Sequence, residues 1–512
     1  GASAGKAGCA AVGADAGGWA ARWFREPSCG SDYGASDLCA RETGAGNGGM
    51  VARAIVTGET APAPERGGRL CLAKRRRKKQ GRHEGLGMLD TLHVTELSNG
   101  IRVVSLAKPE AEGVRVAIHV RVGSRNEPER LNGASHFIEH MLFKGTPTRT
   151  AKGISQAIEG QGGVLNAYTD RDHTCYYAVV PYDKLGVALD VLGDLFYQST
   201  FEPREFERER QVITEEIRMY DDQPDSLVMD RLAAQLWAGH PLGRPILGPM
   251  MGVLTMPRAE VLAYRKAQYA PCRTLFSFAG RVDHEACVKA VSALAGRLRN
   301  PRILREPEPF SRVIPQERLS VIRRSVQQTQ LAFGWRVPGA AEAAPQPALS
   351  MLSCLLGETM MSRLFQSIRE RRGLCYSVSS GVSQGVDFGA LSISAGCAPA
   401  KAERCARAIL AEVRRLAECP VGAAELRRTR DYLCGRFRLR MDGTPIGWAA
   451  TRLLFGLPAD PEVMLAGWQA VRAEDIQGLA QQLLTPAALS LAVVEPEQLD
   501  AKVPDWAAMV QA

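Results

Sequence analysis

The chain has 512 residues, which is too long for one ordinary domain, and its 45% hydrophobic and 23% charged residues are normal for globular domains with sizeable cores. The net charge of +9 is unevenly placed, since residues 1–87 hold 14 Lys and Arg against 8 Asp and Glu, and the remaining residues hold 50 against 47. The nearly neutral body gives no case for a nucleic-acid partner, and because no stretch approaches 18 uninterrupted apolar residues, no membrane partner is expected.

Residues 1–87 differ in character from everything that follows. They are rich in Gly and Ala, lack apolar periodicity and end in the basic run "KRRRKKQGRH", Lys74 to His83. Such a composition cannot bury enough surface to offset the entropy of ordering, so a disordered tail is predicted. The basic run resembles a targeting or nucleic-acid patch, but a solvated tail, or translated sequence upstream of a start at Met88, is the favoured interpretation.

From Met88 onward the sequence is typical of an ordered mixture of strands and helices. "GIRVVSLAK" and "VRVAIHVRVG" are rich in Val and Ile and predict strands, and the segment with "HFIEH" then predicts a helix. A second helix is predicted near "AKGISQAIEGQG", followed by a hairpin-like strand pair in "VLNAYTDRDHTCYYAVVP". "YDKLGVALDVLGDLFYQ" and "PREFERERQVITEEIRMYDD" predict two further helices, the second strongly charged on one face.

The same order of elements recurs, weakly, after a Pro-, Arg- and Glu-rich linker that begins near Pro301. "LSVIRRSVQQTQLAFGWRV" predicts strands, "PALSMLSCLLGETMMSRLFQSIRERRG" one helix, "CYSVSSGVSQGVDFGALSISAGC" strands, and "KAERCARAILAEVRRLAEC" a helix. The prediction is therefore an α+β protein with two similar α/β domains, residues 88–300 and 310–512, each an antiparallel-rich sheet covered by helices. The second copy contains no histidine, so any metal chemistry belongs to the first.

His136 and His140 stand four residues apart in "HFIEH", with Glu139 directly before the second. On a helix, residues at this spacing lie about 40° apart around the axis and project side by side, so two imidazoles can bind one zinc ion. Glu139 can act as the base for a water at that metal. A helix that happens to carry two histidines is the alternative interpretation.

A catalytic zinc needs a third protein ligand and an open fourth position. The predicted helix at residues 203–222 is rich in carboxylates, and Glu209 and Glu216 lie seven residues apart on one face. Spacing alone does not choose between Glu209, Glu215 and Glu216.

Several motifs in the same order give the chain a resemblance to the M16 metallopeptidases, called inverzincins, and to their processing-peptidase-like branch. The motifs are "HFIEHMLFKGT", "LNAYTDRDHTCYYA", "ERQVITEEIRMYDDQPD" and "PLGRPILGP", and the resemblance runs from about Leu92 to Leu489. It implies that His136 and His140 bind Zn²⁺ and that Glu139 is the general base. It also implies that Glu216 is the third ligand and Glu209 a supporting acidic residue.

The resemblance extends to residues that contact a peptide substrate. "RERRGLCY" implies that Arg369 and Tyr376 reach the substrate at the zinc, where both can hydrogen-bond a developing oxyanion. "NAYT" implies a substrate-binding edge strand made of Asn166, Ala167, Tyr168 and Thr169. Where the family often has a glycine-rich stretch, this chain has "LGETMMSRLF" with only Gly357, which argues against presequence recognition by a glycine loop.

The resulting prediction is a zinc-dependent endopeptidase that hydrolyses extended or unfolded peptides. The resemblance implies two domains packed as a clam shell and, for a chain of this length, a homodimer, or a heterodimer with a related subunit, around an enclosed chamber. A non-catalytic structural or chaperone-like relative and a mitochondrial processing peptidase subunit are the alternatives. The 13 cysteines show no paired spacing, which indicates a reducing compartment. A bacterial-type cytoplasmic enzyme is expected, with the mitochondrial matrix as the alternative.

Overall fold

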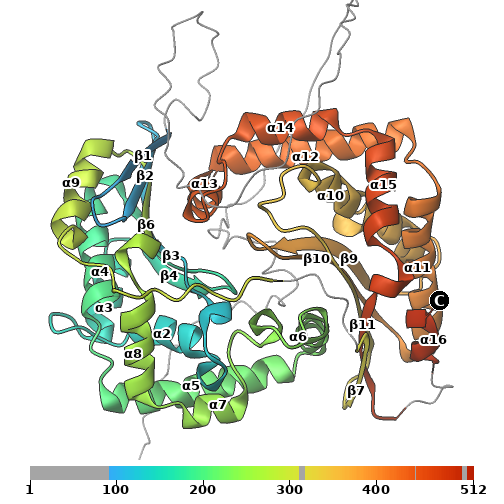
Figure 1. The fold of residues 1–512 in the computed structure, drawn as a ribbon, viewed down its shortest axis with the longest axis horizontal. Coiled ribbons are helices and arrows are strands. Elements are labelled where there is room, and N and C mark those ends of the chain that lie inside the picture. Colours follow the sequence, from blue (N-terminus) through green and yellow to red (C-terminus); the bar gives the residue numbers. More distant parts are fainter. Residues whose placement is uncertain (1–91, 311–316, 444, 499–503, 512) are drawn as a thin grey trace, which may run out of the picture. The chain divides into compact units, whose positions relative to one another are not determined.

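The structure is a computed structural model that describes residues 92–310, 317–443, 445–498 and 504–511. The predicted tail, residues 1–87, lies outside the described residues. The described residues form two β-sheets, each of them covered by helices (Figure 1). The predicted α+β class, with two similar sheet-and-helix units, is confirmed.

The first sheet has six strands in the order β1-β2-β6-β3-β5-β4. Neighbouring strands are antiparallel except β2 and β6, which run parallel. Its central strands carry Val, Ile and Phe side chains, which pack well on a buried pleated surface. β4 is an edge strand, so among the described residues one side of its backbone has no neighbouring strand. The strands are β1 (Leu92–Glu96), β2 (Arg102–Ala107), β3 (Gly113–Val120), β4 (Val164–Thr169), β5 (Thr174–Pro181) and β6 (Thr274–Gly280).

The helices of the first half share one apolar core with this sheet. Buried side chains from β3, β5 and β6 meet apolar faces of the helices in one cluster, which includes Ile118, Tyr176 and Phe276. In this core α2 packs against α5, the other helix that carries predicted metal ligands, and against α8 (Figure 1). The helices are α2 (Ala134–Leu142), α3 (Ala151–Glu159), α4 (Leu185–Gln198), α5 (Pro203–Asp221), α8 (Arg258–Gln268) and α9 (His284–Ala295).

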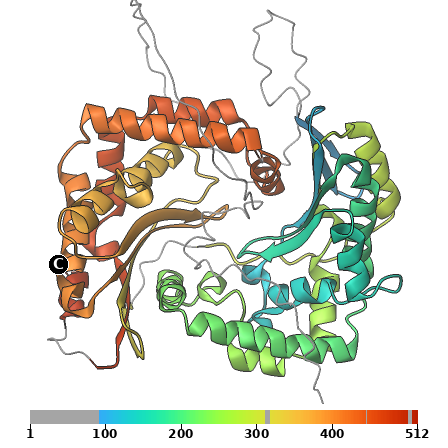
Figure 2. The same ribbon diagram turned by 180° about the vertical axis from the view of Figure 1, so that it is seen from behind.

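The second sheet has five strands in the order β7-β11-β8-β10-β9, and only β7 and β11 run parallel. Helices α11 and α15 lie side by side on one of its faces, as both views show (Figures 1 and 2). The strands are β7 (Leu319–Arg324), β8 (Thr329–Arg336), β9 (Ser377–Gln384), β10 (Gly389–Cys397) and β11 (Ser490–Pro496). The main helices are α10 (Gln346–Ser353), α11 (Ala402–Glu418), α12 (Ala423–Gly443), α14 (Pro461–Ala470) and α15 (Ala473–Leu483).

Two helices pack on the sheet of the other half of the chain. α6 (Pro224–Leu236) packs on β8 and β11, where Leu232 and Leu236 meet Ala332 and Ala492. α13 (Pro445–Leu454) packs on β2 and β6, where Ile446, Ala450 and Leu454 meet Val104, Leu106 and Leu275. The division at residues 300–310 separates the two sheets but not these helices, so the predicted domain boundaries stay a prediction.

The prediction of one helix over residues 347–373 is wrong. After α10 the chain forms a π-helical turn, Cys354–Glu358, leaves the helix at Thr359, and resumes helical turns that end at Glu370. Gly357 lies against β9, where a Cβ atom would come within 2.5 Å of the Ser380 nitrogen. The apolar periodicity continues across the break, because both segments bury a face in the same core.

None of the helices within the described residues is long and apolar enough to cross a membrane.

Candidate metal centre

The histidine pair lies on α2, a helix of only nine residues that starts after Gly133. Gly133 has a φ of 98°, and a Cβ atom there would lie 2.5 Å from the Leu247 carbonyl oxygen, so only glycine fits this helix start. Phe137, Ile138 and Met141 are fully buried and fix the rotation of the helix. The opposite face therefore presents His136 and His140 together.

His136, His140 and Glu216 converge from α2 and α5, and one ligand atom of each lies within 4.8 Å of the others. The two Nε2 atoms are 3.3 Å apart. Glu216 Oε2 lies 3.7 Å from His136 Nε2 and 3.4 Å from His140 Nε2. Two imidazole nitrogens and one carboxylate oxygen are the donor set that a catalytic zinc site uses.

The carboxylates of α5 occupy different surroundings. Glu209 is 3% exposed, and its two oxygens contact His140 Nδ1 at 2.8 Å and Lys144 Nζ at 2.6 Å. Glu215 points to solvent and pairs with Arg218. The geometry thus separates the three candidates that spacing left open: Glu216 faces the histidines, Glu209 supports one of them, and Glu215 lies on another face.

The electrostatics of the centre favour positive charge between the carboxylates. Burial opposes ionisation of His140, but Glu209 and Glu216 outweigh it and raise the pKa of His140 to about 9. Burial likewise opposes ionisation of Glu209, yet its contacts with His140 and Lys144 lower its pKa. Lys144, which lies two residues beyond the end of α2, was not among the predicted site residues.

Glu139 lies next to the metal-ligand candidates and is bonded to the edge strand. The Thr169 hydroxyl, at the end of β4, donates to Glu139 Oε2 at 2.5 Å. One carboxylate oxygen of Glu139 is therefore oriented by the strand that was predicted to bind substrate. The sequence placed both residues in the site but did not predict this bond.

The other residues of the predicted substrate strand lie along β4 at the edge of the first sheet. The Asn166 side-chain oxygen accepts a hydrogen bond from the Ala167 backbone nitrogen at 2.8 Å. Tyr168 contacts His173, with its hydroxyl 3.4 Å from His173 Nε2. An edge strand of this kind can accept an extended peptide through main-chain hydrogen bonds.

Arg369 and Tyr376 lie beside each other in the second half of the chain. The Arg369 guanidinium lies 5.6 Å from the centre of the Tyr376 ring and 4.7 Å from that of Phe365. Tyr376 is 76% exposed, so its hydroxyl is open to an incoming molecule. Their approach to substrate at the metal stays a prediction.

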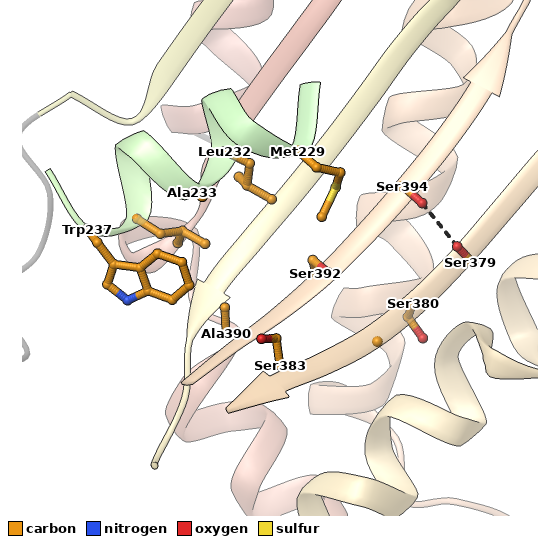
Figure 3. A pocket seen from close by; sticks show the side chains of 12 residues that line it. Met229, Leu232, Ala233, Trp237, Ser379, Ser380, Ser383, Ala390, Ser392 and Ser394 are labelled. Atoms are coloured by element: carbon orange, nitrogen blue, oxygen red, sulfur yellow. Dashed lines mark hydrogen bonds between the residues drawn. The ribbon is translucent and has the colours of Figure 1, made fainter. Parts of the chain in front are cut away.

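A separate pocket lies between α6 and the second sheet. Figure 3 shows apolar side chains of α6 on one wall and serines of β9 and β10 on the other, with Ser379 and Ser394 bonded to each other at 3.0 Å. None of its lining residues is ionisable, and none belongs to α2 or α5, so the pocket is distinct from the candidate metal centre. It is lined by Met229, Leu232, Ala233, Leu236, Trp237, Ser379, Ser380, Gly381, Ser383, Ala390, Ser392 and Ser394.

Comparison with known families agrees with this fold. Residues 102–250 match the family described as Insulinase (Peptidase family M16), and residues 255–433 match the Peptidase M16 inactive domain. The chain is 35% identical over 396 residues to an uncharacterised zinc protease of Mycobacterium bovis, covering 76% of this chain and 90% of that protein. An uncharacterised zinc protease of Bacillus subtilis is 32% identical over 406 residues, covering 78% of this chain and 97% of that protein. The chain belongs to peptidase family M16.

Solved structures share the fold at lower identity. A protease from Helicobacter pylori superposes with a TM-score of 0.74 at 23% identity, covering 79% of this chain and 99% of that one. The peptidase M16 inactive domain from Pseudomonas fluorescens gives a TM-score of 0.75 at 17% identity, covering 81% and 100%. These likenesses concern the arrangement of strands and helices.

Proposed function

We propose that the chain is a zinc-dependent endopeptidase that hydrolyses extended or unfolded peptides. The observation that carries this proposal is the convergence of His136, His140 and Glu216 from two helices, with Glu139 beside them. The names of the bacterial relatives, zinc proteases, point in the same direction.

The donor set fits zinc in kind and in size. Ligand atoms about 2.0–2.1 Å from a tetrahedral zinc lie about 3.3–3.4 Å from one another. The three distances of 3.3, 3.4 and 3.7 Å between the candidate ligand atoms are close to that value. Glu209 holds His140 through Nδ1, which leaves Nε2 directed at the other two donors. When bound, zinc would acidify a water molecule and polarise the scissile carbonyl.

Glu139 is the general base of the proposed reaction. It takes a proton from the attacking water while the water oxygen forms a bond to the carbonyl carbon. It then returns the proton to the amine nitrogen as the carbon–nitrogen bond breaks. The Thr169 hydroxyl donates to Glu139 Oε2 and thereby orients the carboxylate of the base.

The peptide is held by groups from both halves of the chain. An extended substrate adds to the edge of β4 at Asn166, Ala167, Tyr168 and Thr169, through main-chain bonds that depend little on sequence. Arg369 and Tyr376 donate to the carbonyl oxygen as negative charge develops on it. Because residues of both halves act on one peptide, closure of the halves gates the reaction.

The proposal includes a homodimer around an enclosed chamber, acting in the bacterial cytoplasm. Light scattering after size exclusion is expected to give twice the mass of one chain. A mass of one chain, or dimerisation only with a related subunit, would contradict the homodimer. Neither result would bear on the proposed peptide hydrolysis.

The first experiment incubates the zinc-loaded protein with a mixture of unstructured peptides and identifies products by mass spectrometry, beside Glu139→Gln. Internal cleavage by the wild type and none by the variant is expected. If neither cleaves while both hold one zinc per chain, the catalytic proposal fails and a structural or chaperone-like role takes its place.

A further inference from the structure

Glu127 is a buried carboxylate at the start of α2 that the proposed mechanism does not use. It lies between two short 3₁₀ turns, Ser124–Asn126 and Glu129–Leu131, and is 3% exposed. Its Oε1 accepts a hydrogen bond from the Ser135 nitrogen at 2.6 Å. Its Oε2 accepts from the Gly133 nitrogen at 2.8 Å and from Asn132 Nδ2 at 3.0 Å.

The metal helix has no cap of its own at this end. Its N-cap residue is Gly133, which has no side chain, and the first turn contains no acidic residue. The first N–H groups of a helix have no partner within it and carry a partial positive charge. Glu127 supplies both the acceptors and the negative charge from outside the helix.

We propose that Glu127 is a positioning residue for the metal centre, whose carboxylate fixes the first turn of α2 and thereby aims His136 at Glu216. This rests on the proposed function. Ser135, whose N–H it holds, is the residue directly before His136, so any shift of that turn moves the imidazole.

The opposite end of α2 is held by another buried carboxylate. Glu209 binds His140, and Ser199 Oγ donates to the Met141 carbonyl oxygen at 2.9 Å. Two carboxylates from different segments thus fix the two ends of a nine-residue helix. A helix of this length is not stable on its own.

Glu127 is itself anchored to the segment that follows α6. Its carbonyl oxygen accepts from Arg244 Nη1 at 3.2 Å. Asn132 Nδ2 bonds both Glu127 and the Pro245 carbonyl oxygen, at 3.0 Å each. The start of α2 is therefore held in place by the segment after α6 as well as by its own neighbours in sequence.

The test separates positioning from general stability with a matched control. Glu495 of β11 is also a buried glutamate, 1% exposed, and accepts bonds from Trp506 Nε1 and Arg323 Nε at 3.1 Å each. Full-length wild type, Glu127→Gln, Glu495→Gln and His136→Ala are compared. Zinc affinity is measured by competition with a chromophoric chelator, the visible spectrum is recorded with Co²⁺, and peptide kcat and KM are determined.

Burial raises the pKa of Glu127 to about 7, against the opposing bonds from Ser135, Asn132 and Gly133. The measurements are therefore made at about pH 8, where this carboxyl is ionised in the wild type. Tyr264, whose hydroxyl lies 3.4 Å from Ser135 Oγ, stays neutral there because burial raises its pKa.

Glu127→Gln is expected to weaken zinc binding about 10–100-fold, as loss of a supporting partner does at other metal sites. The Co²⁺ bands shift and kcat falls, while KM stays within about twofold because β4 is untouched. Glu495→Gln lowers thermal stability without any of these changes. A folded Glu127→Gln whose zinc affinity and Co²⁺ spectrum equal those of Glu495→Gln would overturn the proposal.

Glu127→Asp keeps the charge but shortens the side chain, and it serves if the glutamine variant does not fold. It is expected to lose part of the zinc affinity and to shift the Co²⁺ bands less, and an Asp variant with wild-type values overturns the proposal. Failure of the proposed function looks different: the wild type then cleaves no peptide, or it binds zinc no more tightly than His136→Ala does.

Discussion

At the scale of single residues, three glutamates of one helix are expected to behave differently when each is changed to glutamine. Glu216→Gln removes a ligand and loses most zinc. Glu209→Gln removes the negative charge and leaves one acceptor oxygen for both His140 and Lys144, and it weakens zinc binding about 10–100-fold. Glu215→Gln gives up only a surface pair with Arg218, so zinc binding and cleavage stay unchanged. Zinc content by mass spectrometry and chelator competition measure the series.

Equal zinc loss in Glu215→Gln and Glu216→Gln would contradict this ordering. It would mean that the register of α5 against α2 differs from the one described, because seven residues keep Glu209 and Glu216 on one face while Glu215 points away. Thermal melting of all three variants controls for a general loss of structure.

Thr169 offers a second test at this scale, because its hydroxyl donates a hydrogen bond that orients Glu139. A hydrogen bond to a charged group contributes about 1.5–3 kcal/mol, so Thr169→Val is expected to lower kcat about tenfold or more. Thr169→Ser keeps the hydroxyl and should restore most of the rate. A valine variant with full kcat would show that Glu139 is oriented by other contacts.

At the scale of elements, the edge of β4 is the feature on which the proposed peptide binding depends. Ala167→Pro removes a backbone N–H that is bonded to the Asn166 side chain. Proline is tolerated on edge strands, so the fold should persist. KM for unstructured peptides is expected to rise about tenfold or more, since each lost main-chain bond weakens the added strand. Steady-state kinetics measure KM, and circular dichroism checks that the variant is folded. An unchanged KM would mean that the peptide does not bind at β4.

Elements with strong local signals could be predicted from the sequence, and the break after α10 could not. The β4–β5 hairpin follows from residues that favour extended backbone, and α5 follows from helical spacing with one charged face. The interruption at Thr359 lies next to Gly357, which packs closely on Ser380 of β9, a contact that is not local in the sequence. An apolar pattern reports which face is buried, but it does not report whether the helix stays continuous.

The candidate site shows the same limit. The two histidines and Glu139 stand in one short segment, so their grouping could be predicted directly. Spacing left three candidates for the third ligand, because choosing among them needs the packing of α5 on α2. Glu127 was missed, although "NGASH" gave a signal: a helix that starts at glycine without a first-turn acid needs an acceptor from elsewhere.

At the scale of the whole molecule, the two halves of the chain are joined by more than their linker. α6 and α13 each bury apolar side chains against the sheet of the other half, so neither sheet has a complete cover without the other half. Because such burial is mainly hydrophobic, it is little affected by salt or pH. The ionic contacts between the halves are the ones that a change of pH can weaken.

The ion pair between Arg125 and Asp387 is the clearest of these contacts. Arg125 Nη1 and Nη2 lie 2.6 and 3.0 Å from the two Asp387 oxygens, and Asp387 also accepts from the Phe310 nitrogen at 3.1 Å. Burial opposes ionisation of Asp387, but these bonds outweigh it and lower its pKa. An acid with a lowered pKa in the folded state stabilises the fold at pH values above its unfolded pKa of about 3.9, and this contribution is lost as the pH falls through the folded value.

Asp387→Asn is therefore expected to destabilise the protein by about 2–3 kcal/mol at pH 7, less than a fully buried pair because Asp387 is one-third exposed. The difference between wild type and variant should stay constant from about pH 7 to 5 and shrink as the pH falls below about 4. Melting temperatures of both proteins across this range measure it, and the other carboxylates cancel because they titrate in both. A difference that stays constant down to pH 3 would show that the charge of Asp387 does not stabilise the junction. The loss would then come from the second carboxylate oxygen, because asparagine offers Arg125 and Phe310 one acceptor oxygen in place of two.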